Sequence, residues 1–170
     1  MLSIRKAGIN DTEILVSLGS ETFYDTFRPF NSEDDMQAYI SKAYHPDVIK
    51  QNLQNPEIAY YLCEDGDVSV GYIKLIANNS YSGLEGKTIE LEKIYVLKQY
   101  FGKDAGQLLM DKAIEHAIQK NFHYLFLGVW KENSRAVKFY EKNGFEIFSE
   151  RSFQLGKRLC EDYMMRKKLS

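Results

Sequence analysis

The sequence predicts an α/β (α+β) fold in which a mixed central sheet of about seven strands is flanked by about four to five helices. The order of the segments indicates this class: a strand, three helices, an antiparallel meander, a helix, a strand, a helix and two strands. The helix predicted over 106–120 joins two strand segments, 88–96 and 124–130, and a crossover of this kind joins parallel strands. The 170 residues show no repeat, linker or break in composition, so we expect a single domain over 1–170.

The N-terminal region predicts one strand followed by a helix. Residues 2–6 alternate briefly between apolar and polar side chains, and Asn10–Asp11 then supplies an N-cap signal. We expect this helix to end at about Phe27. One of its faces should carry Ile14, Leu15, Leu18, Thr22 and Phe23.

Two further helices and an antiparallel meander come next. Ser32 lies three residues before Asp35 in a weak capping box, and His45–Pro46 begins a short third helix. Strand signals follow at 58–63 and 68–77, separated by the turn-forming pair Asp65–Gly66.

The second half of the chain predicts alternating strands and helices after a polar, glycine-bearing loop. Asn133 opens the last helix, and Asn143–Gly144 closes it. The remaining predicted segments are the loop 78–87, the strand 88–96, the helix 106–120, the strand 124–130 and the final strands 145–155 and 161–169.

The composition excludes several classes of protein. Apolar residues make up 44% of the chain and charged residues 27%, which is typical of a globular protein and not of a disordered one. The net charge of −2 provides no basic field for nucleic acid, and we expect no direct nucleic-acid partner. No apolar run reaches the roughly 18 residues of a membrane span and the first residues lack signal-peptide order, so we expect no membrane partner and a cytoplasmic protein.

The cysteines and histidines predict neither disulfides nor a metal site. Cys63 and Cys160 fit no CxxC spacing and are expected to be reduced thiols. The three histidines are His45, His116 and His123, and none has a partner three or four residues away. We therefore expect no metal.

The stretch from Ile89 to Gly106 carries the first chemical signal. A strand is followed by the segment Gly102–Gly106, which leads directly into a helix. Backbone N–H groups and the positive end of the helix dipole converge at such a loop, so a pyrophosphate would fit there. The loop has neither the P-loop ending nor the three-glycine dinucleotide pattern, which argues against ATP and NAD. A helix start that merely needs glycine is an equally good explanation.

Two carboxylates on the same strand form the second signal. Strict alternation would place Glu90 and Glu92 on one face with Ile94 and Val96, unless a bulge intervenes. This face either meets water or carries a general base with a pKa raised by burial and by its like-charged neighbour. An acidic lining for a cationic substrate is a third possibility.

The third signal lies in the helix that follows the strand 124–130. By periodicity alone, Tyr140 would be a core aromatic residue. However, this helix and the preceding loop together resemble the GNAT superfamily of N-acetyltransferases. The later motif of that family is present in full as Asn133, Ala136, Phe139–Tyr140 and Gly144–Phe145. The loop motif is only partly present: Gly106 is kept, while Phe101 stands where the family has Gln or Arg and Asp104 stands where it has its first Gly.

Within this superfamily, the chain is most similar to the PaiA-type spermidine/spermine N-acetyltransferases of bacteria. The similarity extends over nearly the whole chain and is clearest in the segments 21–27, 31–39, 89–96 and 127–133. The resemblance implies a GNAT fold and an enzyme that uses acetyl-CoA, without a metal, to acetylate a small-molecule amine, most closely a polyamine. This PaiA type is also associated with effects on gene expression.

The resemblance also assigns roles to individual residues. It implies that Tyr140 protonates the departing CoA thiolate and that Glu90 or Glu92 is the general base. The residues implied in cofactor binding are Ile94, Tyr95 and Val96 at the pantetheine arm, Gly102, Lys103, Asp104, Ala105, Gly106 and Gln107 at the pyrophosphate, and Asn133, Tyr140 and Lys142.

Several questions stay open at this point. Acidic residues in the N-terminal helices suit a polycation, yet acidic residues at helix starts also complement the helix dipole. A protein N-terminus or an aminoglycoside is an alternative acceptor, and a non-catalytic acyl-CoA-binding regulatory module is an alternative function. The protein is expected to be a monomer or a homodimer.

Overall fold

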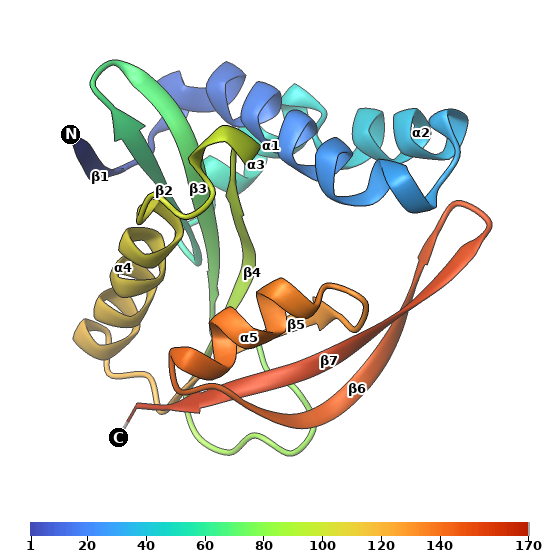
Figure 1. Ribbon diagram of the computed structural model, residues 1–170. Helices are drawn as coiled ribbons and strands as arrows, with labels where there is room; N and C mark the ends of the chain where they lie inside the picture. The colour runs from blue at the N-terminus through green and yellow to red at the C-terminus, as the bar shows by residue number, and fades with distance from the viewer. Residues whose placement is uncertain (170) are drawn as a thin grey trace.

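Seven strands form one mixed sheet in the computed structural model, which describes residues 1–169 (Figure 1). The strand order is β1-β2-β3-β4-β5-β7-β6, and only β4 and β5 are parallel neighbours. The predicted α+β class is therefore confirmed. The strands are β1 (Leu2–Lys6), β2 (Ile58–Asp65), β3 (Val68–Ala77), β4 (Thr88–Val96), β5 (Tyr124–Trp130), β6 (Glu146–Leu155) and β7 (Arg158–Lys168).

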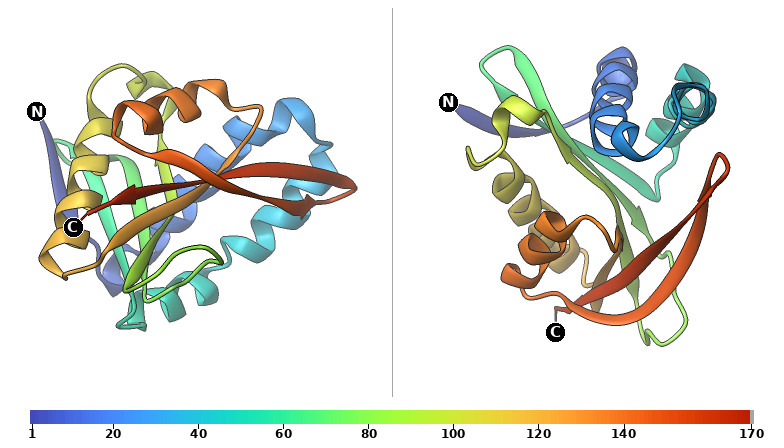
Figure 2. Two further views of the ribbon diagram at one scale, coloured as in Figure 1. Left: turned by 90° about the horizontal axis from the view of Figure 1, so that it is seen from below. Right: turned by 45° about the vertical axis from the view of Figure 1, so that its right-hand side comes forward.

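Helices cover both faces of the sheet (Figure 2). One layer contains α1 (Thr12–Phe27), α2 (Glu33–Ala43) and α3 (Pro46–Gln54), and the other contains α4 (Ala105–Gln119) and α5 (Ser134–Lys142). Both α1 and α4 pack against β3 and β4, which are therefore covered on both sides. This explains why β3 is nearly continuously apolar, as expected for a strand buried on two faces.

The helix boundaries follow from the capping residues. The side chains of Ser32, His45 and Asn133 each accept a hydrogen bond from a backbone N–H in the first turn of their helix. At the end of α5, Gly144 has a φ of +88°, which is the left-handed conformation that glycine adopts readily. These signals are local, and the predicted helices therefore agree closely with the observed ones.

The last hairpin differs from the prediction. The strand expected over 161–169 begins three residues earlier, at Arg158, because Gly156 and Lys157 alone form the turn after β6. Leu155 pairs with Arg158 directly across this turn. The tip of the hairpin reaches α2, where the backbone N–H of Lys157 donates to Asp35 Oδ2 at 3.4 Å. The hairpin therefore extends from the sheet to the helical layer of α1 to α3 (Figure 1).

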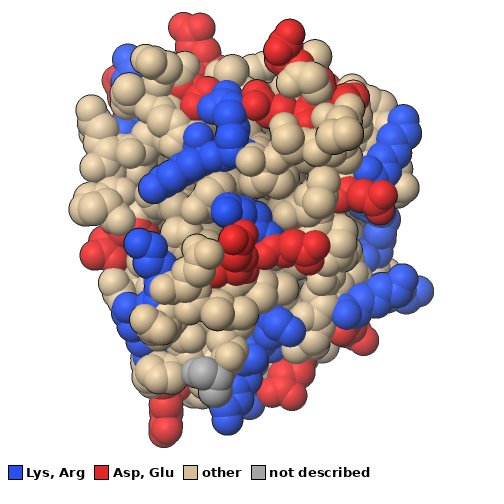
Figure 3. Space-filling view, turned by 90° about the vertical axis from the view of Figure 1, so that its left-hand side faces the viewer, with Lys and Arg blue, Asp and Glu red and all other residues tan. Residues whose placement is uncertain are grey.

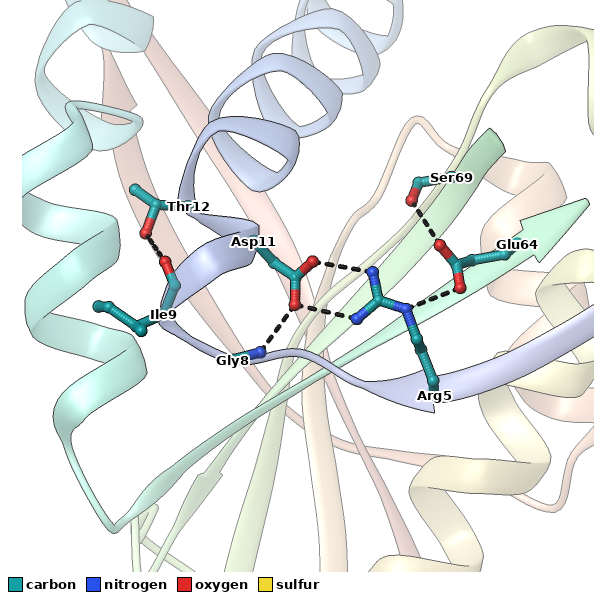
Figure 4. A network of polar contacts seen from close by, with 7 residues as sticks. All are labelled: Arg5, Gly8, Ile9, Asp11, Thr12, Glu64 and Ser69. Atoms are coloured by element: carbon teal, nitrogen blue, oxygen red, sulfur yellow. Dashed lines mark hydrogen bonds and ion pairs between the residues drawn. The ribbon is translucent and has the colours of Figure 1, made fainter. Parts of the chain in front are cut away.

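A polar network attaches β1 to the start of α1 (Figure 4). The Arg5 guanidinium donates to both oxygens of Asp11, at 2.8 and 3.0 Å, and to Glu64 at 2.7 Å. Asp11 also accepts from the backbone N–H of Gly8. The hydrogen bonds from Arg5 lower the pKa of Asp11. One arginine thus connects β1, the turn before α1, and β2.

Candidate active site

The central feature of the site is a gap between β4 and β5. These strands pair only through Thr88–Glu90 and Tyr124–Phe126 and then diverge. The edge of β4 that faces β5 therefore has free backbone N–H and C=O groups over 91–96, while its other edge stays paired with β3. A cavity of about 850 Å³ lies in the gap and extends to α5 and to the loop before α4.

Most of the cofactor-binding residues expected from the sequence line this cavity. They are Ile94, Tyr95, Val96, Gly102, Asp104, Gly106, Gln107, Asn133, Tyr140 and Lys142. Two expected residues do not line it. Ala105 is fully buried, and the Lys103 amino group lies over the Tyr100 ring, 5.4 Å from its centre.

The loop before α4 leaves backbone donors unused. The first hydrogen bond of α4 runs from the Leu108 N–H to the Asp104 carbonyl, so the N–H groups of residues 105–107 come before the helical ladder. Gly102 and Asp104 have φ values of +75° and +70°, and the Asp104 side chain makes no capping hydrogen bond. A glycine would adopt this φ without strain at position 104, whereas aspartate adopts it at a cost.

The two strand glutamates do not share a face with Ile94 and Val96, as strict alternation would require. Lys74 pairs with Lys93 and Leu75 with Leu91, so Glu92 is an extra residue in β4 without a partner in β3. This β-bulge shifts the phase of the side chains after Leu91. The simple alternation was therefore wrong, and the two glutamates lie in different environments.

Glu92 lines the cavity, whereas Glu90 does not. Glu92 accepts a hydrogen bond from Lys74 Nζ at 3.0 Å, and its side chain is 31% exposed. Glu90 is only 5% exposed and accepts a hydrogen bond from Asn79 at 2.8 Å. Burial, followed by the charge of Glu92, raises the pKa of Glu90.

Tyr140 is buried between Phe139 and Phe145, and it also borders the cavity. Its hydroxyl forms no hydrogen bond to any residue within 1–169. Burial raises its pKa, so the phenol keeps its proton at neutral pH. The arrangement leaves an O–H donor free at the cavity wall.

Reasoning from the sequence missed two cations of α5 that line the cavity, Arg135 and Lys138. The Arg135 guanidinium lies over the Phe101 ring, with its central carbon 3.7 Å from the ring centre. Phe101 occupies the loop position where the family has Gln or Arg, and its ring contacts a cation supplied by α5. The spacing of Arg135, Lys138 and Lys142 along one helix was the available signal.

A smaller cavity of about 210 Å³ lies on the side of α1 to α3 and shares Glu92 with the main cavity. Its walls combine two lysines with several tyrosines, namely Lys74, Lys93, Tyr39, Tyr44, Tyr60 and Tyr72. A third cavity of about 240 Å³ adjoins Thr26 and Trp130 of the main one and includes Asp25 and Glu132. Glu92 thus lies between the main cavity and the smaller cavity on the side of α1 to α3.

The charged surface, the cysteines and the helices of residues 1–169 give no sign of a metal site or a membrane span. The face that carries α4 intersperses Lys and Arg with Asp and Glu (Figure 3). Cys63 and Cys160 are both free and buried. Among residues 1–169, no group of three or more His, Cys, Asp or Glu side chains is arranged to hold a metal ion. No helix in the described part of the chain is long and apolar enough to cross a membrane.

The comparisons with known proteins agree with this geometry. The pattern of the acetyltransferase (GNAT) family matches residues 20–145. The "Uncharacterized N-acetyltransferase in pepI 3'region" of Lactobacillus delbrueckii subsp. lactis is 32% identical over 161 residues, which are 94% of this chain and 92% of that protein. A spermidine N(1)-acetyltransferase of Thermoplasma acidophilum is 26% identical over 152 residues, covering 86% of this chain and 89% of that protein.

A solved structure shares the fold over its full length. The crystal structure of a PaiA N-acetyltransferase from Thermoplasma acidophilum in complex with coenzyme A superposes with a TM-score of 0.81 and 24% identity, covering 99% of both chains. The predicted GNAT fold is therefore confirmed. The chain belongs to the acetyltransferase (GNAT) family and is an N-acetyltransferase.

Proposed function

We propose that the cavity between β4 and β5 binds acetyl-CoA and that the enzyme transfers the acetyl group to a primary amine of a polyamine such as spermidine or spermine. The observation that carries this proposal is the free edge of β4. The carboxylate of Glu92 and the phenol of Tyr140 line the same cavity as this edge. The similarity to the spermidine acetyltransferase of Thermoplasma acidophilum supports the choice of acceptor.

The cavity residues fit the parts of this cofactor. The free backbone groups of residues 94–96 would pair with the amides of the pantetheine arm. The N–H groups at the start of α4 would bind the pyrophosphate, and Arg135, Lys138 and Lys142 would place positive charge near the phosphates. When bound, acetyl-CoA supplies the acetyl thioester that an amine attacks.

Glu92 is the better candidate for the general base. An amine acceptor is protonated at neutral pH and has to lose a proton before its nitrogen attacks. Glu92 borders both the main cavity and the smaller cavity on the side of α1 to α3, which we call the acceptor-side cavity. A proton would therefore pass to Glu92 directly or through one water. Glu90 lies outside both cavities, and we assign it a different role below.

Tyr140 is the candidate general acid. Its hydroxyl is protonated, borders the cavity and is not engaged by another described residue. It would donate a proton to the sulfur that leaves when the carbon–sulfur bond breaks. Reactants held together in one cleft add the proximity contribution that such a transfer requires.

One observation favours a second acceptor. Lys74 and Lys93 border the acceptor-side cavity, and two positive charges would attract a carboxylate on the acceptor. A peptide α-amino group with a nearby acidic side chain is therefore the alternative substrate.

The test is CoA release by the purified protein with acetyl-CoA and a panel of spermidine, spermine, a short diamine, an aminoglycoside and an acidic N-terminal peptide. We expect turnover to be highest with the polyamines. Preferential turnover of the peptide would replace the polyamine with the alternative acceptor. Absence of transfer to every amine would refute the proposed reaction.

A further inference from the structure

Two buried carboxylates share one arginine beside the point where β4 and β5 diverge. Glu90 belongs to β4 and Asp162 to β7, and each residue is only 5% exposed. Arg151, on β6, lies against both: its Nη1 is 3.9 Å from Glu90 Oε2 and its Nε is 3.4 Å from Asp162 Oδ2. These are long contacts for an arginine–carboxylate pair, which typically has a spacing of about 2.8 Å.

The negative charge of this cluster is only partly compensated. One guanidinium faces two carboxylates. Glu90 also accepts a hydrogen bond from Asn79, whereas Asp162 Oδ1 is buried without a hydrogen bond to any residue of the described chain. Burial is the leading cause that raises the pKa of both acids, which agrees with incomplete pairing. Buried carboxylates normally have their oxygens paired, so this cluster has room for a second donor.

The cluster adjoins the active-site cavity through Gly128. This glycine lines the cavity, and a Cβ atom built on it would lie 2.6 Å from Arg151 Nη2 and 3.2 Å from Asp162 Oδ2. The absence of a side chain at Gly128 thus lets the guanidinium and the carboxylate pack directly against a residue that lines the cavity. Arg151 itself is held loosely, since its side chain is 40% exposed on the outer strand of the sheet.

We propose that Glu90 and Asp162 bind the second positive charge of the acceptor and that Arg151 occupies this position when no acceptor is bound. The inference rests on the proposed function and deepens it, because it assigns the site an acceptor with two ammonium groups. One ammonium would lose its proton to Glu92 and react, while the other displaces Arg151 toward solvent and donates to the two carboxylates. Arg151 therefore sets the affinity for dications without taking part in acetyl transfer.

Trp130 gives a readout that does not depend on activity. It is the single tryptophan of the chain, it lines the cavity, and it pairs with Asp162 across β5 and β7. We would titrate the fluorescence of Trp130 with 1,4-diaminobutane and with 1-aminobutane, which share one amine and differ in the second charge. Kinetics with spermidine would be measured in parallel.

Arg151→Gln removes the resident cation, and we expect it to lower the Kd of the diamine about tenfold. Asp162→Asn removes one carboxylate and should raise the same Kd about tenfold. The Kd of the monoamine should change less than about twofold in both variants. The matched control is Arg166→Gln, because Arg166 pairs with an exposed carboxylate, Glu146, across the same two strands and should affect neither amine.

Two results would overturn the inference. One is weaker diamine binding in Arg151→Gln, which would make Arg151 a structural residue or a direct part of the binding surface. The other is an unchanged diamine preference in Asp162→Asn. Should Arg151→Gln fail to fold, two other variants decide the question. Asp162→Asn is one, and the conservative Arg151→Lys, which we expect to tighten diamine binding partially, is the other. Failure of the wild type to acetylate any amine would refute the proposed function, whereas the Trp130 titration would still test the carboxylate pair.

Discussion

Replacing Asp104 tests the proposed pyrophosphate site before α4, at the position where this chain departs from its family. Asp104 precedes α4 in a left-handed conformation, and its carboxylate makes no capping hydrogen bond. Its negative charge therefore stands close to the proposed pyrophosphate site without stabilising the free N–H groups. We expect both Asp104→Asn and Asp104→Gly to bind CoA more tightly than the wild type.

The magnitude follows from charge and backbone conformation. Two unit charges about 4 Å apart in water interact by about 1 kcal/mol, which is about fivefold in Kd. Asp104 is exposed, so we expect about this gain in affinity for both variants. The glycine variant also removes about 1 kcal/mol of left-handed strain but adds about as much unfolded-state entropy. Its unfolding free energy should therefore stay within about 0.5 kcal/mol of that of the asparagine variant.

Calorimetric titration with CoA at low and high ionic strength is the assay. The gain in CoA affinity should be smaller at high salt, because salt screens the repulsion between exposed charges. Asp34→Asn serves as the control, since it removes a carboxylate from the first turn of α2, outside the cavity. Unchanged or weaker CoA binding in both Asp104 variants would refute the placement of the pyrophosphate in this loop.

Three further predictions concern other parts of the molecule. Tyr140→Phe should lower kcat at least about 100-fold and leave the Kd for CoA unchanged, and an unaltered rate of CoA release would remove Tyr140 from the mechanism. Arg135→Met should weaken CoA binding about tenfold in the same titration, with equal affinity arguing against a phosphate contact. Asp11→Asn should lower the free energy of unfolding in urea by about 2 kcal/mol at neutral pH. Because Arg5 lowers the pKa of Asp11, this contribution is present above the unfolded pKa of about 3.9 and is lost as the pH falls through the folded value, so the variant and the wild type should converge in acid.

Local signals predicted the fold well, and contacts between distant segments account for the errors. Ser32, His45 and Asn133 act within one helical turn, so their caps are readable in the sequence. The bulge at Glu92 depends on how β3 and β4 pair, and nothing within β4 itself indicates it. The early start of β7 likewise depends on a two-residue turn that sets the register with β6.

In the candidate site, too, local motifs were readable in the sequence and contacts between distant segments were not. The segment from Asn133 to Phe145 led to Tyr140, which lines the cavity as expected. The contact between Arg135 and Phe101 joins a helix to a loop far earlier in the chain, so no sequence motif reported it. The partner of Glu92, Lys74, lies on the neighbouring strand, and the pairing appears only once the register is known.

The short ladder between β4 and β5 also divides the molecule mechanically. Strands β1 to β4 and strands β5 to β7 form two half-sheets that pair over Thr88–Glu90 and Tyr124–Phe126, with a backbone hydrogen bond from His123 to Lys87 beside this ladder. A ligand that pairs with the free edge of β4 and also contacts α5 adds a second set of contacts between the two half-sheets. Binding of such a ligand couples the unfolding of the two half-sheets. Amide hydrogen exchange should then slow in both halves together when the cofactor binds. A cofactor bound as proposed would therefore complete the sheet between β4 and β5 as well as take part in the reaction.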